Sequence, residues 1–114
     1  MIELKPLLWL GSSLDDVRNF PEVARRQLGH QLLLVQAGES PTDWKPIRGV
    51  GVGVQEIRIH VPNEFRVAYV VRFPEAVYVL HAFSKKSQKT VTSDLRTIQR
   101  RHSQLLAFRI SKDY

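Results

Sequence analysis

Three short segments in the second half of the chain alternate between polar and apolar residues, and they constrain the fold more than any other feature. They run over residues 54–60, 64–73 and 77–84, and only the tripeptides VPN and PEA separate them. Such linkers are too short for crossover connections, so consecutive strands must pair through hairpins. The pattern therefore predicts an antiparallel three-stranded meander.

Helical spacing dominates the first part of the chain. A short strand over 5–10 is followed by apolar residues three or four apart, which predicts helix on both sides of Phe20. Pro21 interrupts this pattern, because proline lacks the N–H for the preceding turn and its ring clashes with that turn. We expect two linked helices with a corner at Phe20, ending near Gly38.

The remaining segments complete the predicted architecture. Residues 39–53 contain two prolines and three glycines, which indicates a loop, and an apolar stripe that begins at Leu95 predicts a last helix. We expect an α+β fold: a small antiparallel sheet of about four strands, two N-terminal helices packed on one face, and a C-terminal helix. With 114 residues, the chain forms a single domain over 1–114.

Composition excludes several classes of function. The chain has no cysteine, so disulfides, thiolate metal sites and thiol nucleophiles are excluded, and we expect neither a metal nor a cofactor. No segment reaches the roughly 18 apolar residues of a membrane span, and the start lacks a basic leader, so no membrane partner is expected. These features favour a soluble, cytoplasmic protein.

Positive charge is concentrated in the second half of the chain. From Met1 to Asp43, four basic residues face six acidic ones, whereas from Trp44 to Arg101 eleven basic residues face four acidic ones. A basic half attracts polyanions over long distances. The distribution favours a nucleic acid as partner, although a merely basic and well-solvated domain would have the same composition.

Charged side chains are predicted to share one face of the sheet. Residues two apart in a strand point the same way, which groups Glu56 with Arg58 and His60, and Arg66 with Arg72. If the helices cover the apolar face, this polar face is exposed. Metal-free RNA cleavage needs a base, cations for the phosphate and an acid, and Glu56, Arg58, Arg66 and nearby lysines are suitable groups. A half-solvated sheet without a site would show the same alternation.

Several stretches together resemble the RelE/HigB superfamily of bacterial toxins, in particular its phage-associated HigB-like branch. They are KPIRGVGVGVQEIRI, FRVAYVV and YVLHAFSKKSQKT, and the similarity extends from the opening LGSSLDDVRNFP to the last helix. The resemblance implies a RelE-like α+β toxin that enters the ribosomal A site and cuts the mRNA there. It also implies a cognate helix-turn-helix antitoxin, through which alone the toxin would contact operator DNA.

Catalytic roles follow from the resemblance position by position. Arg66 matches the arginine that holds the scissile phosphate, and Arg58 lies two residues after the base position. Glu56 occupies that base position, where other members carry lysine or glutamate. Lys85 and Lys86 lie where relatives have a basic residue that stabilises the transition state.

Further residues are candidates for contact with RNA. Lys89 resembles an additional RNA contact, Lys45 and Arg48 lie in the glycine-rich loop, and Arg72 shares the polar face. Several relatives carry a tyrosine or histidine after the basic segment, and this chain has none there. His81 is close by but lies inside the strand, either packed or functional, so the general acid is unassigned.

Two other functions are compatible with the same scaffold. A ParE-like toxin would inhibit DNA gyrase without being an enzyme, and an inactive phage remnant would only bind its antitoxin. The basic set in EIR, FRV and SKK favours RNA cleavage over gyrase inhibition, whereas a remnant would be recognised by the absence of toxicity even without the antitoxin.

Overall fold

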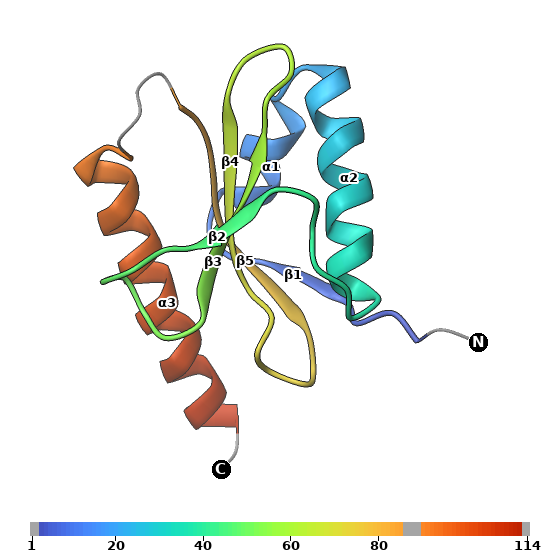
Figure 1. Cartoon of the computed structure of the whole chain (residues 1–114). Helices are drawn as coiled ribbons and strands as arrows, with labels where there is room; N and C mark the ends of the chain where they lie inside the picture. The colour runs from blue at the N-terminus through green and yellow to red at the C-terminus, as the bar shows by residue number, and fades with distance from the viewer. Residues whose placement is uncertain (1–2, 86–89, 113–114) are drawn as a thin grey trace.

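The computed structural model describes residues 3–85 and 90–112. These residues form five strands, which make up one sheet, and three helices (Figure 1). In chain order they are β1 (Leu7–Trp9), α1 (Ser13–Arg18), α2 (Glu22–Gln36), β2 (Trp44–Pro46), β3 (Val54–Ile59), β4 (Phe65–Val70), β5 (Val77–Ser84) and α3 (Thr92–Lys112). The predicted α+β fold and the corner before Pro21 are confirmed, since α1 ends at Arg18 and α2 begins at Glu22.

The sheet has the strand order β1-β5-β4-β3-β2. The strands β3, β4 and β5 form the predicted antiparallel meander, and β1 lies parallel to β5 at one edge. Residues 39–53 were expected to be a loop, but within them β2 pairs antiparallel with β3 at the other edge of the sheet. Backbone pairing to β3 is sufficient to hold these three residues, although proline and glycine surround them.

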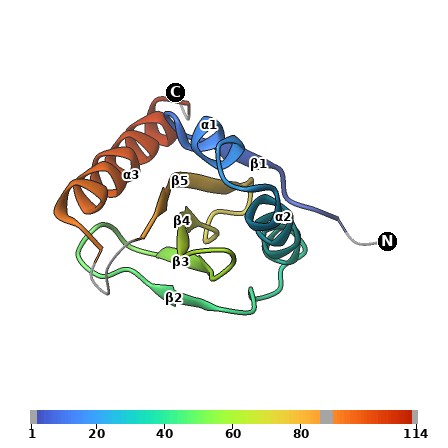
Figure 2. The same cartoon turned by 90° about the horizontal axis from the view of Figure 1, so that it is seen from above.

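Helices cover both faces of the sheet. On one face, Ala24, Leu28, Leu32 and Val35 of α2 pack against a cluster that includes Ile57 and Val67. On the other face, Ile98 and Leu105 of α3 pack against a second cluster around Val70 and Leu80. Figure 2 shows α2 and α3 on opposite sides of the strands. Burying each of these leucine, isoleucine and valine side chains contributes roughly 1.5–3 kcal/mol.

The face expected to be exposed is therefore largely covered, and that expectation is wrong. The physical reason lies in β4 and β5, which carry apolar residues at both alternations, for example Ala68 and Val70 beside Val67. A strand that is apolar on both sides requires a covering layer on both sides. The charged residues occupy the part of this face that continues beyond the apolar cluster.

Side-chain contacts fasten α3 along its length. Near its start, Asp94 is 2.7 Å from His81 of β5, and in its middle Arg101 donates to the carbonyl of Leu80 at 2.9 Å. Near its end, Arg109 pairs with Glu75 in the β4–β5 turn, Nε to Oε2 at 2.6 Å. These contacts hold α3 on the sheet beside the charged residues.

Candidate active site

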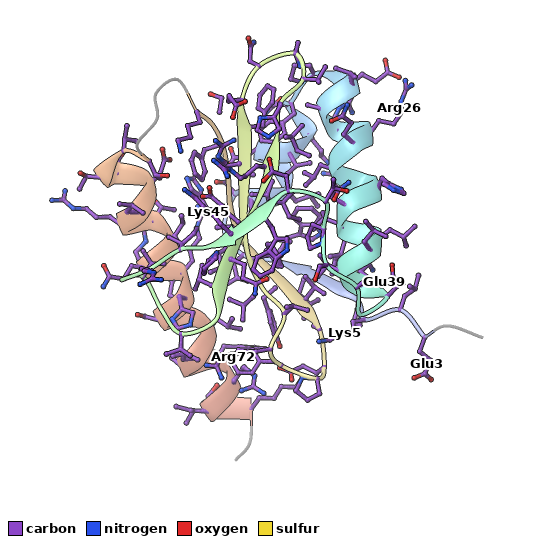
Figure 3. All side chains as sticks on the ribbon, in the orientation of Figure 1. Glu3, Lys5, Arg26, Glu39, Lys45 and Arg72 are labelled. Carbon is purple, nitrogen blue, oxygen red and sulfur yellow. The ribbon has the colours of Figure 1, made fainter. Side chains whose placement is uncertain are left out.

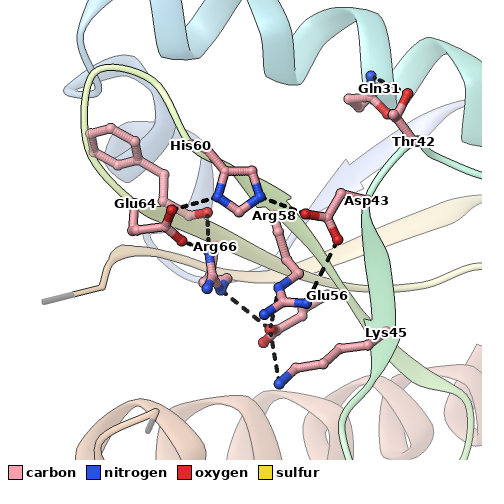
Figure 4. Close-up of polar contacts among 10 residues, drawn as sticks. Gln31, Thr42, Asp43, Lys45, Glu56, Arg58, His60, Glu64 and Arg66 are labelled. Carbon is pink, nitrogen blue, oxygen red and sulfur yellow. Dashed lines mark hydrogen bonds and ion pairs between the residues drawn. The ribbon is translucent and has the colours of Figure 1, made fainter. Parts of the chain in front are cut away.

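Glu56 lies at the centre of a cluster of basic side chains. Its Oε1 is 3.3 Å from Nε of Arg66, 4.0 Å from Nε of Arg58 and 3.8 Å from Nζ of Lys45 (Figure 4). The strand register explains the convergence, because Arg58 is opposite Arg66 and Lys45 is opposite Glu56. Residues from three neighbouring strands thus meet on one face of the sheet.

The centre of this cluster is buried. Glu56 is 1% exposed and Arg66 is 4% exposed, so the prediction that these two side chains are open to solvent is wrong. The side chains of Lys45 and Arg58 are 47% and 31% exposed and form the outer part of the cluster. A buried carboxylate requires such compensating cations, since an unpaired buried charge is strongly destabilising.

Lys85 adjoins the cluster at the end of β5. It is 8% exposed, and its backbone N–H donates to the carbonyl of Glu64 at 2.8 Å. Burial lowers the pKa of the Lys85 ammonium, and the charge of Arg66 lowers it further. Lys85 therefore holds its proton less firmly than an ordinary lysine.

A second set of contacts closes a ring with the cluster. Nη1 of Arg66 donates to Oε2 of Glu64 at 2.6 Å, and the other oxygen of Glu64 contacts Nδ1 of His60. Nε2 of His60 is 2.5 Å from Oδ2 of Asp43. The charge ring, as we call it, consists of six residues that alternate in charge: Asp43, His60, Glu64, Arg66, Glu56 and Arg58 (Figure 4).

Contacts within the ring raise the pKa of one of its groups and lower the pKa of another. The hydrogen bonds to Asp43 and Glu64 raise the pKa of His60. The same bond from His60, together with that from Arg66, lowers the pKa of Glu64. Both shifts favour the charged forms, an imidazolium between two carboxylates.

An open hollow adjoins the ring at the β3–β4 hairpin. It has a volume of about 670 Å³, and its lining includes His60, Glu64, Ser84 and Lys85. Sequence reasoning placed His60 on the same face as Glu56 but gave no role to His60, Glu64 or Asp43. The available signal was the spacing of two residues between Glu64 and Arg66 and between Arg58 and His60.

Other candidate residues lie apart from the ring. Arg72 is six residues beyond Arg66, about 20 Å along the strand direction. It donates to the carbonyl of Val52 at 3.2 Å and stacks on Phe73. Figure 3 shows Arg72 well separated from Lys45. Arg48 is exposed in the loop between β2 and β3, and within the described residues it forms no ion pair with the ring.

The remaining predicted residues are His81 and two lysines. The side chain of His81 contacts Asp94 through Nε2, and its ring stacks on Phe83 with ring centroids 5.0 Å apart. Lys86 and Lys89 lie outside the described residues. Within residues 3–85 and 90–112 no group of three or more histidine and acidic side chains is arranged to hold a metal ion. No described helix is long and apolar enough to cross a membrane.

The chain is similar in structure to the E. coli toxin RelE and to a chain of the RelBE toxin-antitoxin complex. A doubly substituted E. coli toxin RelE in the free state matches with a TM-score of 0.60 and 20% sequence identity, covering 82% of this chain and 95% of that chain. A chain of the intact E. coli RelBE toxin-antitoxin complex matches with a TM-score of 0.58 and 18% identity, covering 73% and 99%. The chain therefore has a RelE-like α+β toxin fold.

The family is defined by the sequence itself. Residues 15–103 match the family model of the phage-derived protein Gp49-like, DUF891. This match spans most of the chain, so the protein belongs to the phage-derived Gp49-like family. A search of curated protein sequences gives no match.

Proposed function

We propose that this protein is the toxin of a type II toxin-antitoxin system and cleaves mRNA in the ribosomal A site without a metal ion. The observation that carries the proposal is the convergence of Arg58, Arg66, Lys45 and Lys85 around one buried carboxylate, on a RelE-like fold. Several cations fixed on one surface can stabilise the charge that develops on a phosphodiester during cleavage.

The residues divide the work of cleavage among them. Arg66 and Arg58 bind the oxygens of the scissile phosphate, since a guanidinium is planar and stays charged. Lys85, whose pKa is lowered, accepts the proton of the 2'-hydroxyl in its neutral form. This replaces Glu56 as the base, because Oε1 of Glu56 is buried beneath the cations that it aligns. The products are a 2',3'-cyclic phosphate and a free 5'-hydroxyl.

The proposed partners follow the same reasoning. The substrate is mRNA held by the ribosome, and the basic residues outside the ring contact rRNA. A cognate helix-turn-helix antitoxin, encoded beside the toxin, neutralises it in the cytoplasm and binds the operator. One structure with the same fold is that of a toxin-antitoxin complex.

The proposal is tested by mapping RNA 5' ends by primer extension on a translated message, with and without ribosomes. Wild-type protein should give new ends only with ribosomes, and Arg58→Gln should lower the cleavage rate about 100- to 1,000-fold. Arg25→Gln is the matched control, because Arg25 is exposed on α2 away from the ring. Growth arrest with intact translation and no new 5' ends would instead indicate a gyrase inhibitor.

A further inference from the structure

The carboxylate of Glu64 bridges two groups that suit an RNA phosphate. One oxygen accepts from Nη1 of Arg66 at 2.6 Å, and the other contacts Nδ1 of His60. A phosphodiester, like a carboxylate, presents two oxygens on one central atom, and both are acceptors for the same donors. The position of Glu64 is therefore one in which a phosphate group would touch Arg66 and His60 at once.

We propose that the Glu64 carboxylate occupies the subsite of the scissile phosphate in the free protein, and that His60 is the general acid that protonates the leaving 5'-oxygen. This inference rests on the proposed function, and it assigns the acid that the sequence does not reveal. A catalytic role is appropriate because His60 would contact the substrate directly once Glu64 has moved aside.

The structure leaves room for an RNA phosphate to replace the Glu64 carboxylate. Glu64 lies in the β3–β4 hairpin with a side chain that is 40% exposed, so it can turn outward into solvent. His60 is 49% exposed and lines the hollow together with Lys85. A nucleotide in the hollow would thus lie between the proposed base and the proposed acid.

Asp43 keeps His60 in the form that an acid needs. Its Oδ2 is 2.5 Å from Nε2 of His60, which orients the ring and leaves Nδ1 facing the subsite. The raised pKa of His60 favours the imidazolium, and the charge of the entering phosphate replaces that of Glu64. Two carboxylates contact His60 directly, Asp43 before β2 and Glu64 of the hairpin. Three cations lie one contact further out: Arg58 of β3 pairs with Asp43, Arg66 of β4 pairs with Glu64, and Lys85 after β5 lines the same hollow.

The step balances without any further reactant. The 2'-oxygen attacks phosphorus and loses its proton to the neutral amine of Lys85, and the new O–P bond closes the cyclic phosphate. The bond from phosphorus to the 5'-oxygen breaks, and its electron pair stays on that oxygen. Nδ1 of His60 donates its proton there, which leaves a neutral imidazole and a 5'-hydroxyl.

A sulfur substitution in the message tests this assignment. The assay uses ribosomes programmed with two messages, one natural and one with sulfur in place of the 5'-oxygen at the cleaved A-site linkage. A thiolate leaves without a proton, so it does not require the acid. His60→Gln should cleave the natural message about 100-fold more slowly than wild type and the sulfur message within about threefold of it. His30→Gln, an exposed histidine on α2, should match wild type on both messages.

The outcomes separate the two proposals. Wild-type protein that cleaves neither message on the ribosome would overturn the proposed function. Wild-type cleavage with an equally active His60→Gln would overturn the acid assignment alone. A slow His60→Gln that sulfur fails to rescue would also overturn it, because the loss would then be structural.

Two further variants test the subsite and the orienting carboxylate. Glu64→Gln removes the competing charge, so it should bind a non-cleavable 2'-deoxy message on the ribosome at least about threefold more tightly than wild type. Unchanged or weaker binding would refute the shared subsite. Asp43→Asn should move the limb of the rate profile that reports His60 toward lower pH, because His60 then loses its proton more easily. An unmoved limb would count against His60 as the acid.

Discussion

Replacing Arg66 by methionine should destabilise the protein strongly, because it leaves Glu56 charged in a buried position. Arg66 is the partner nearest to Oε1 of Glu56, at 3.3 Å, and both side chains are almost wholly buried. Removing one partner of a buried pair costs about 3–5 kcal/mol. Lys45 and Arg58 remain 3.8 and 4.0 Å away but are partly solvated, so we expect the lower end, about 3 kcal/mol.

A double-mutant cycle measures the coupling energy between Arg66 and Glu56. Glu56→Gln alone should cost about 1.5 kcal/mol, because Arg66 keeps its bond to Glu64. The double variant removes both charges and should cost only about 2 kcal/mol, whereas additivity would give about 4.5 kcal/mol. The expected coupling energy is therefore about 2.5 kcal/mol.

Urea unfolding followed by tryptophan fluorescence measures each free energy, and thermal unfolding should show a loss of roughly 12 °C for Arg66→Met. The matched control is the pair Arg26 and Glu22 on α2, 2.5 Å apart but with side chains 75% and 72% exposed. Its coupling should not exceed about 0.5 kcal/mol. Additive effects at Arg66 and Glu56 would refute the picture of a buried, mutually dependent pair.

Three other substitutions have defined outcomes. Glu75, whose pKa its arginine partner lowers to about 2, stabilises the fold above its ordinary pKa of 4.5 and loses this contribution as pH falls toward 2. Comparing urea midpoints at pH 7 and pH 2.5 should show Glu75→Gln about 1 kcal/mol less stable at pH 7, with only a fraction of this difference left at pH 2.5. Gly11→Ala should cost more than Gly38→Ala in thermal unfolding. Both glycines have positive φ, and placing alanine in that conformation costs about 1–2 kcal/mol at either site. Only at Gly11 would the added Cβ also lie 2.5 Å from the side chain of Arg101. Equal losses of stability at the two sites would contradict this reasoning. Lys85→Met should raise stability at neutral pH, since the lowered pKa marks a charge that folding disfavours, while it abolishes cleavage. A less stable Lys85→Met would show that the ammonium is favourably paired.

The strand and helix pattern was readable because local rules govern it. Alternation with three-residue linkers defined the meander, and Pro21 defined the corner between α1 and α2. The strand β2 was missed because Trp44–Pro46 has no alternation of its own, and its pairing depends on β3. A three-residue edge strand is specified by its neighbour and leaves almost no signal in the sequence.

The sequence predicted the central residues of the site but not how deeply they are buried. Alternation and register place Glu56, Arg58 and Arg66 on one face, as expected. Their burial depends on ion pairs between side chains of three different strands and on α3 covering the neighbouring apolar surface, which periodicity does not report. His60 meets Asp43 across 17 positions because β2 turns back along β3, so that contact follows from the missed strand.

Because charges alternate around the charge ring, the residues that attract RNA from a distance differ from the residues that would cleave it. With His60 protonated, its three acidic and three basic members cancel, so the ring exerts little pull at a distance. The formal net charge of +6 counts histidine as neutral, which leaves the ring at −1 and the residues outside it at +7, including exposed Arg96 and Arg100 on α3. Salt should then slow encounter with the ribosome, because it screens those outlying charges, while it leaves turnover of already bound message almost unchanged.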